Sequence, residues 1–296
     1  MSTPLASLAQ PRVLGASPSP ALFIRLGLRG GADPRASLRA LVAALDPERA
    51  VLGVGAPLAQ ALGASVPGLR AFETVSGVGV TWPAAQGALW MALHGGDQGT
   101  LLHEALDLLA LLPDFTVEDS APGYQHRDSR DLSGYIDGTA NPEGEEAVEA
   151  ALHDGPAGLA GGSFLHAMRW VHDLDALRAM RQGDRDLMIG RRISDNEEIE
   201  DAPESAHVKR TAQEDVGVLL RRSMPWGSLD RAGLMFLAYS RDPDVFQAHA
   251  RRMVGLEDGV VDALHRFSRP VSGGLYWCPP VAGGRLDLSA LGITNN

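Results

Sequence analysis

The segment "GLMFLAYSRDPDVFQAHARRMV" (233–254) combines the signals of a strand and of the helix that follows it. Its first eight residues are an apolar run of strand length. Asp242 can cap a helix, and Pro243 suits the first helical position. The apolar residues that follow fall on one face at helical spacing: Val245, Phe246, His249, Ala250 and Met253. The segment therefore predicts a strand followed directly by a helix that packs on a sheet.

The same arrangement occurs near the N-terminus. "ALFIRLGL" (21–28) is an apolar run of strand length, and "ADPRASLRALVAAL" (32–45) follows it. Asp33 can cap this second helix, and Pro34 can begin it. Its apolar face comprises Leu38, Leu41, Val42 and Leu45. The recurrence indicates a chain built from two similar halves.

The remaining pattern favours an α+β fold, because strands and helices do not alternate regularly as in a parallel sheet. We expect two antiparallel sheets, each with helices on one face. The predicted halves are residues 1–125 and 161–296, joined by a connector, 126–160, that is rich in Gly, Pro, Asp and Glu. Further strands are predicted at 50–56, 68–76, 88–95, 162–173, 216–227 and 274–280, and helices at 98–112, 173–181 and 185–192; the segment 115–128 is predicted as a strand that runs into an extended segment.

The composition excludes several classes of protein. The net charge is −11, from 26 basic and 37 acidic residues, which argues against non-specific binding of nucleic acid or anionic membranes. The single cysteine, Cys278, rules out an internal disulfide or a thiolate metal cluster. The N-terminal segment 1–15 lacks the basic region and apolar core of a secretion signal, and no apolar run reaches the length of a membrane span. We expect a soluble cytoplasmic protein.

The stretch "DLSGYIDGTANP" (131–142) holds one carboxylate, Asp137, between Gly134 and Gly138, followed by Asn141. Glycines and an Asn-Pro pair are typical of sharp turns. One interpretation is an ordinary Asp-Gly turn. The other is that the backbone is bare so that a large ligand can lie against it, with the carboxylate aimed at that ligand.

A histidine and an arginine downstream could act with this carboxylate. His207 follows a long polar loop (190–210) that either wraps around a ligand or is simply solvated. Arg221 and Arg222 end an apolar strand, so one of them points inward, where a guanidinium needs an anionic partner; a surface ion pair is the alternative. Histidine is a common axial ligand to haem iron. A carboxylate and an arginine on the opposite face would handle a bound peroxide.

In these segments the chain resembles the dye-decolorizing peroxidase family of haem proteins, most of all its bacterial cytoplasmic branch. The stretch 130–146 is similar to the family's GxxDG haem-loop motif. Further similar segments follow in the family's order: "MIGRRISDNEEI", "AHVKR", "LLRRSMPWG" and "RPVSGGLYW". The resemblance implies two ferredoxin-like halves, with one haem b per chain between the sheet and the helices of the second half.

The resemblance also implies roles for individual residues. Asp137 would be the distal acid–base, Arg221 the distal arginine and His207 the proximal iron ligand. Arg191 would meet a haem propionate. Gly138 would let the loop approach the porphyrin, Asn141 would fix the turn or contact haem, and Ser223 would take a distal position that is Asn or Ser in relatives. Asp262 would hold the proximal imidazole, or else pair with Arg266 one helical turn away.

The implied activity is reduction of hydrogen peroxide with one-electron oxidation of organic donors such as dyes or phenols. The donor would react at the haem edge or through an aromatic residue, for which the candidates, each also explained as core, are Tyr135, Tyr239, Trp226, Tyr276 and Trp277. Two alternatives are a haem or porphyrin handling or storage protein with little turnover and a structural α+β dimer without a cofactor.

We also expect a homo-oligomer. The tail "GGRLDLSALGITNN" (283–296) is similar to the docking peptides by which some relatives enter protein shells; a frayed terminus is the alternative.

Overall fold

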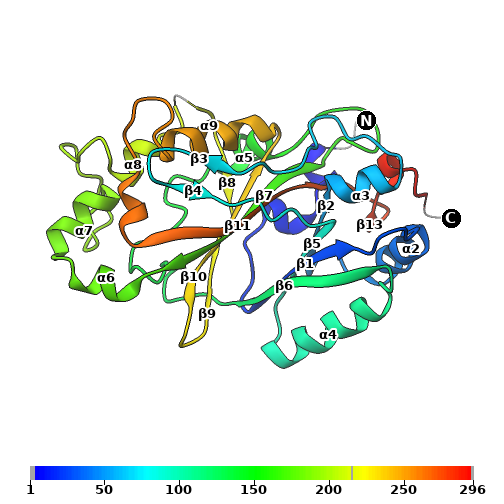
Figure 1. Cartoon of the computed structure of the whole chain (residues 1–296). Helices are drawn as coiled ribbons and strands as arrows, with labels where there is room; N and C mark the ends of the chain where they lie inside the picture. Colours follow the sequence, from blue (N-terminus) through cyan, green and yellow to red (C-terminus); the bar gives the residue numbers. More distant parts are fainter. Residues whose placement is uncertain (1–3, 215, 295–296) are drawn as a thin grey trace.

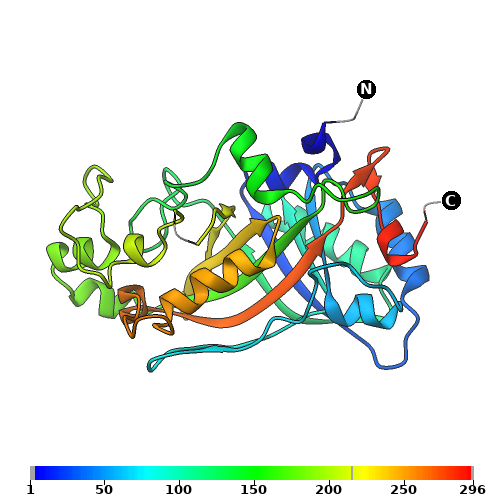
Figure 2. The same ribbon diagram turned by 90° about the horizontal axis from the view of Figure 1, so that it is seen from above.

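The protein is built around one antiparallel sheet that closes on itself (Figures 1 and 2). A computed structural model describes residues 4–214 and 216–294. The strand order is β7-β11-β2-β5-β1-β6-β9-β10-β8, and β10 also pairs with β7, which converts the sheet into a barrel. The strands are β1 Ala21–Leu28, β2 Ala50–Gly55, β5 Leu89–His94, β6 Phe115–Gly123, β7 Ser163–His172, β8 Leu220–Arg221, β9 Met224–Gly227, β10 Ala232–Ser240 and β11 Ser268–Cys278.

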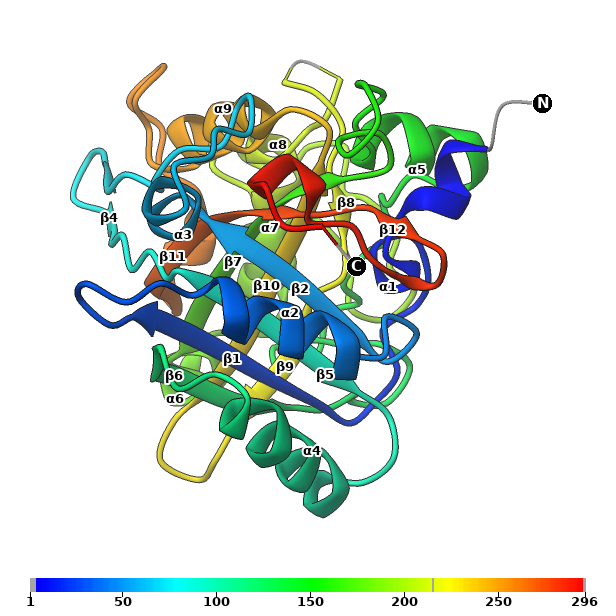
Figure 3. The same ribbon diagram turned by 90° about the vertical axis from the view of Figure 1, so that its right-hand side faces the viewer.

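The first half contributes β2, β5, β1 and β6, with two helices on their outer side (Figure 3). Helix α2 (Arg35–Ala44) buries Leu38, Leu41 and Val42 in one core with alternate residues of β1. Helix α4 (Gln98–Ala110) begins at Asp97, whose side chain accepts a hydrogen bond from Thr100 N. These helices cover one face of the first half, as the sequence predicts for an α+β fold.

The second half repeats the plan with β7, β10 and β11 and helix α9 (Pro243–Met253). Asp242 caps α9 by accepting a hydrogen bond from Asp244 N at 2.8 Å, as its sequence predicts. The corresponding helix of the first half, α2, begins slightly differently. Its first residue is Arg35, and the Asp33 side chain accepts from Arg35 N at 3.3 Å. The α+β fold with two ferredoxin-like halves is confirmed, and the barrel joins their sheets.

The remaining elements are short. The helices are α1 Pro11–Leu14, α3 Ala56–Ala61, α5 Gly144–Ala151, α6 Leu174–Ala179, α7 Gln182–Ile189 and α8 His207–Arg210, with 3-10 turns η1 Leu5–Leu8, η2 Ala263–Arg266 and η3 Ser289–Leu291. Two small hairpins are β3 Val75–Ser76 with β4 Thr81–Trp82, and β12 Val281–Ala282 with β13 Arg285–Leu286. In the part of the chain described here, no helix is both long enough and apolar enough to cross a membrane.

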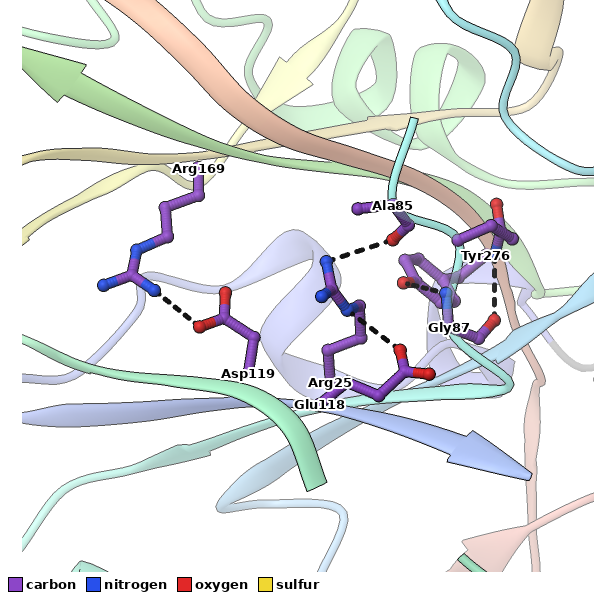
Figure 4. Close-up of polar contacts among 8 residues, drawn as sticks. Arg25, Ala85, Gly87, Glu118, Asp119, Arg169 and Tyr276 are labelled. Carbon is purple, nitrogen blue, oxygen red and sulfur yellow. Dashed lines mark hydrogen bonds and ion pairs between the residues drawn. The ribbon is translucent and has the colours of Figure 1, made fainter. Parts of the chain in front are cut away.

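Charged pairs link the strands inside the barrel (Figure 4). Arg169 of β7 donates to Asp119 of β6 at 2.6 Å, so this ion pair joins the second half to the first. The guanidinium of Arg169 also lies 3.6 Å from the ring centre of Trp226. Arg25 of β1 pairs with Glu118 at 3.2 Å. The two halves are therefore held together by polar contacts as well as by the apolar core.

Two predicted strands differ from the structure. The segment 68–76 is a strand only at its end, in β3, because the Phe72 amide donates to the side chain of Gln86 at 2.9 Å instead of to a neighbouring strand. The predicted strand 216–227 is divided into β8 and β9. At the break, the Ser223 hydroxyl accepts from Leu237 N at 3.4 Å, in place of a regular strand pairing.

The C-terminal tail is packed against the first half as far as the structure describes it. Leu286, Leu288, Leu291 and Ile293 are 1–2% exposed and belong to the large core. A frayed terminus is therefore wrong for residues 283–294, while residues 295–296 lie outside the described part of the chain. A docking peptide would have to leave this core before it could bind a partner.

Candidate functional site

A large cavity lies in the second half, bordered by β7, β10, α7, α8 and α9. We call it the main cavity. Asp137, His207 and Arg221 all line it. A side cavity adjoins it and shares these three residues. Most of the main cavity wall is apolar, formed by residues that include Met168, Ile189, Leu219, Leu234, Phe236, Phe246, Met253 and Leu264.

His207 is the first residue of α8, and a buried carboxylate fixes its ring. Its Nδ1 lies 2.7 Å from Oδ2 of Asp262, whose side chain is fully buried. A carboxylate can only accept, so Nδ1 carries the proton and Nε2 of the neutral ring keeps a lone pair. The other Asp262 oxygen accepts from Leu264 N at 2.8 Å. The alternative pairing of Asp262 with Arg266 is therefore wrong.

A second histidine, His249 of α9, also lines the main cavity. Its Nε2 donates to the carbonyl oxygen of Gly217 at 2.9 Å. Burial lowers the pKa of His249, and the positive charge of Arg221 lowers it further. Within the described part of the chain, the two histidines therefore differ in which ring nitrogen is free: Nδ1 in His249 and Nε2 in His207. His249 has no ligand-like spacing in the sequence, since it lies on the core face of an ordinary amphipathic helix.

The loop that carries Asp137 needs its glycines for its backbone conformation. Gly134 and Gly138 have φ values of 94° and 82°, which side chains rarely adopt. The loop is anchored by Tyr135, whose hydroxyl donates to Asp186 of α7 at 2.5 Å. Asp137 is half-buried and faces both the main and the side cavity. The stretch is thus a sharp turn that also places a carboxylate at the cavity.

Asn141 ties this loop to Arg221. Its Nδ2 donates to the carbonyl oxygen of Arg221 at 2.9 Å, and its Oδ1 accepts from the Arg221 amide at 2.8 Å. Arg221 points into the cavity, while Arg222 points away and donates to the carbonyl oxygen of Leu14. The Arg221 Nε is buried without a hydrogen-bond partner among the described residues. The expectation that one of the two arginines faces inward is confirmed.

Arg191 and Ser223 lie farther out. Arg191 lines the side cavity and is held by Glu198 at 2.8 Å and by the carbonyl oxygen of Asn196 at 3.0 Å. Ser223 lines a third cavity, the access cavity, which also reaches Asp137, Gly138, Asn141 and Arg221. Ser223 therefore lies beside Asp137, Asn141 and Arg221 at the access cavity and is not part of the main cavity lining.

The predicted aromatic relays are mostly remote from the cavity. Tyr135 lines it, whereas Trp226, Tyr239 and Tyr276 are buried in the second core cluster, on the barrel interior. Trp277 is buried in the large core. Other residues at the main cavity that sequence reasoning missed are Trp82, Trp170, Asp131, His172 and Ser268. Asp131 begins the motif stretch 131–142, but the other four lie in separate segments with no recognisable motif, so only the folded chain brings all five together.

The residues present fit a haem. The wall is apolar, as a porphyrin requires, and His207 offers a free Nε2 to iron. Buried nitrogens of Arg221 and Trp170 have no partner among the residues described. Arg191 lines the side cavity, where a propionate could reach it. The described residues contain no cluster of three His, Cys, Asp or Glu side chains that could hold a metal by themselves.

Comparison with known proteins points in the same direction. Residues 128–283 match the family model of the Dyp-type peroxidase C-terminal region. A dye-decolorizing peroxidase of Mycolicibacterium paratuberculosis is 32% identical over 232 residues, which cover 72% of this chain and 63% of that relative, slightly under two thirds of its length.

Solved structures are also similar. A variant of DypB from Rhodococcus jostii in complex with heme has 28% identity and a TM-score of 0.81, covering 90% of this chain and 94% of that one. An encapsulated DyP-type peroxidase from Mycobacterium smegmatis has 27% identity and a TM-score of 0.82, covering 93% and 96%. The similarity to both structures extends over nearly the whole of each chain.

Proposed function

We propose, from the premise that the chain belongs to the Dyp-type peroxidase family, that it is a haem-dependent peroxidase. It would reduce hydrogen peroxide and oxidise organic donors such as dyes or phenols in one-electron steps. The observation that carries this proposal is the convergence of Asp137, Arg221 and the carboxylate-held His207 on one apolar cavity.

One haem b would occupy the main cavity and extend into the side cavity. His207 would ligate the iron through Nε2, with Asp262 holding its Nδ1 proton. Arg191 would pair with a propionate in the side cavity. Gly138 and Asn141 would border the cofactor on the loop side, and Ser223 would lie behind the distal residues.

Haem, when bound, supplies the iron that stores the oxidising equivalents of peroxide and returns them singly. The protein would contribute proton transfer and charge stabilisation. Asp137 would take the proton from one peroxide oxygen and give it to the other, so that water can leave. Arg221, held in place by Asn141, would stabilise the negative charge on the departing oxygen. Preorganised stabilisation of this kind is typically worth about 3–4 kcal/mol.

A rapid-mixing experiment tests the function. The haem-loaded chain is mixed with hydrogen peroxide, and the haem absorption bands and the oxidation of an added phenol are followed together. A peroxidase shows a fast spectral change that reverses as the phenol is oxidised. A haem storage protein, the alternative function, binds haem but shows neither. Asp137→Asn should slow the spectral change by about 10²-fold or more, as expected for the loss of a general acid–base.

The setting of the enzyme is a further part of the proposal. We propose a cytoplasmic homo-oligomer that uses hydrogen peroxide and an organic donor and binds neither nucleic acid nor membranes. The similarity to an encapsulated peroxidase supports association with a shell protein. Because Leu288, Leu291 and Ile293 are buried, docking through the tail 283–296 would require its release. Co-expression with a shell protein, with and without the tail, tests this route; equal loading of both forms would refute it.

A further inference from the structure

Three side chains form a continuous hydrogen-bonded chain in the wall of the main cavity. The Nε2 of His172 lies 3.0 Å from Oδ1 of Asp131, and its Nδ1 lies 2.7 Å from Oγ of Ser268. Asp131 begins the loop that carries Asp137, His172 ends β7, and Ser268 begins β11. The His172 side chain is only 4% exposed. The chain is therefore a buried polar path between separate parts of the fold.

The hydrogen bonds of this path are all donated in one direction, from Ser268 toward Asp131. Burial raises the pKa of Asp131, but the His172 imidazole and the hydrogen bonds from Ser133 outweigh it and hold the pKa below its ordinary value. Asp131 is thus a carboxylate and accepts the Nε2 proton of His172. When the ring carries its proton on Nε2 alone, Nδ1 accepts from the Ser268 hydroxyl. Hydrogen bonds run from Ser268 through His172 to Asp131.

The two ends of the path open on different spaces. Asp131 lines the main cavity and the access cavity. His172 and Ser268 line the main cavity and also an exposed groove on its outer side, which we call the outer groove, formed by 171–175, 178, 228–232 and 265–269. The path therefore runs between the outer groove, which His172 and the buried Ser268 border, and the two cavities that Asp131 borders.

Other charged groups surround the path without interrupting it. On the groove side these are Asp173, Asp175, Arg178, Asp230, Arg231, Arg266 and Arg269. His265 also lines the groove; its pKa is lowered by burial, and its Nε2 lies 3.3 Å from the indole nitrogen of Trp82. The ring of Phe267 lies 5.3 Å from that of His172 and covers it. Among the described residues, Asp131 and Ser268 are the hydrogen-bond partners of the His172 ring.

We propose that Ser268, His172 and Asp131 relay protons from solvent in the outer groove to the main cavity. The inference rests on the proposed function, because reduction of peroxide to water consumes protons: H2O2 + 2 H⁺ + 2 e⁻ gives 2 H2O, with the electrons supplied by the organic donor. Asp137 only moves a proton between the two oxygens of peroxide. The additional protons must come from solvent, and this path leads from solvent to the cavity.

The transfer balances at every atom. A groove water gives a proton to the Ser268 oxygen as the hydroxyl proton passes to Nδ1 of His172. The Nε2 proton passes to Asp131, and the resulting carboxylic acid releases it to water or a reacting oxygen in the cavity. His172 is left neutral as its other tautomer, and it returns to the starting one by losing the Nδ1 proton to water and taking a proton from water at Nε2.

A first test measures proton exchange without any reaction. The full chain is prepared with isotope-labelled histidine and transferred to D2O, and the His172 ring proton is followed by NMR, assigned by its absence in His172→Gln. Relay predicts that Ser268→Ala slows the exchange of this proton by about tenfold or more, whereas Ser268→Thr, which keeps the hydroxyl, restores it. Ser163→Ala is the matched control, because Ser163 is a buried hydroxyl of β7 that donates to the Ala151 carbonyl. Equal exchange in Ser268→Ala and wild type would overturn the proposal.

A second test uses turnover of the haem-loaded chain. We expect Ser268→Ala and His172→Gln to oxidise a phenol about tenfold more slowly, and their rates should rise with the concentration of small buffer acids, which bypass the relay. Wild type and Ser163→Ala should be independent of buffer. A merely structural role would lower the rate without buffer dependence, and that result would contradict the relay. If wild type has no turnover with peroxide, the proposed function fails, and the exchange measurement still decides whether the path carries protons.

Discussion

The side chain of Asn141 is hydrogen-bonded to both backbone polar groups of Arg221: it donates to the carbonyl oxygen at 2.9 Å and accepts from the amide at 2.8 Å. The loop that carries Asp137 and the strand that carries Arg221 are 80 residues apart in sequence and are joined by this pair of hydrogen bonds. The relative position of the two distal side chains therefore depends on Asn141.

Replacement of Asn141 by Ala should slow the reaction with peroxide by about tenfold or more while haem still binds. Leaving the two buried peptide groups unpaired costs about 1–3 kcal/mol each, which lets Arg221 move away from Asp137. Asn141→Asp is the matched variant, since it can still accept from the amide but cannot donate to the carbonyl. Its rate with peroxide should lie between those of wild type and Asn141→Ala. Peroxide rates measured beside haem titrations check this; a normal rate in Asn141→Ala would mean that the strand alone positions Arg221.

Replacement of Asp262 by Asn should raise the reduction potential of bound haem and lower peroxidase activity by about 10–100-fold. The amide keeps a hydrogen bond to His207 but removes the negative charge that makes the imidazole a strong donor. The potential is measured by spectroelectrochemistry. Asp258→Asn is the control, because Asp258 pairs with Arg210 instead of His207. An unchanged potential in Asp262→Asn would show that this carboxylate does not tune the proximal ligand.

Acid should destabilise the fold through His166. Burial, with a smaller contribution from Arg70, lowers the pKa of His166 to about 3, whereas the unfolded chain has the ordinary value of 6.5. Below the unfolded pKa the unfolded state binds a proton that the native state does not, so stability falls as pH falls from about 6.5 toward 3. The contribution is about 3 kcal/mol at pH 4.5.

Replacement of His166 by Phe should remove this part of the acid sensitivity, since the His166 ring stacks on Phe246 at 4.0 Å and both its nitrogens are buried without partners among the described residues. Urea unfolding at pH 7.5 and pH 4.5 checks it, with the exposed His103→Gln as control. An equal loss of stability on acidification in His166→Phe and wild type would show that other groups cause the acid sensitivity.

Truncation of the tail at residue 282 should destabilise the protein by several kcal/mol. It removes Leu286, Leu288, Leu291 and Ile293 from the core, and a buried leucine is worth about 2–5 kcal/mol. Leu291→Ala alone should lower the melting temperature, whereas Leu229→Ala, at an exposed position, should not. A tail deletion that melts like the full chain would mean that these residues are not packed in solution.

Local signals in the sequence predicted the elements whose ends depend on neighbouring residues. Asp242 and Pro243 begin α9 where the pattern places it, because a cap acts within one turn. The strand predicted at 68–76 is wrong for the opposite reason. The Phe72 amide donates to the side chain of Gln86, a contact that a strand pattern cannot indicate. The pairing of β7 with β10 and the Arg169–Asp119 ion pair also depend on residues far apart in sequence.

The candidate site likewise contains some residues that the sequence predicts and others that only the fold brings together. Motif resemblance predicted that Asp137, His207 and Arg221 belong together, and the structure places all three at the main cavity. Nothing local distinguishes His172 from the other strand histidines, because its significance comes from Asp131 and Ser268, which only the fold brings to it. The sequence left the role of Asn141 open between fixing the turn and contacting haem, and the structure adds its two hydrogen bonds to the Arg221 backbone, which no local pattern indicates.

Haem binding by a histidine variant pair tests the central claim most directly. Wild type, His207→Ala and His249→Gln are titrated with haem, and the Soret band is recorded. Both histidines line the main cavity, but only His207 has its Nε2 free, since that of His249 is bonded to Gly217. The account predicts that His207→Ala loses or shifts the band of the histidine-ligated cofactor, while His249→Gln keeps it. A full, unshifted Soret band in His207→Ala would contradict the assignment of His207 as the iron ligand, and with it the proposed site.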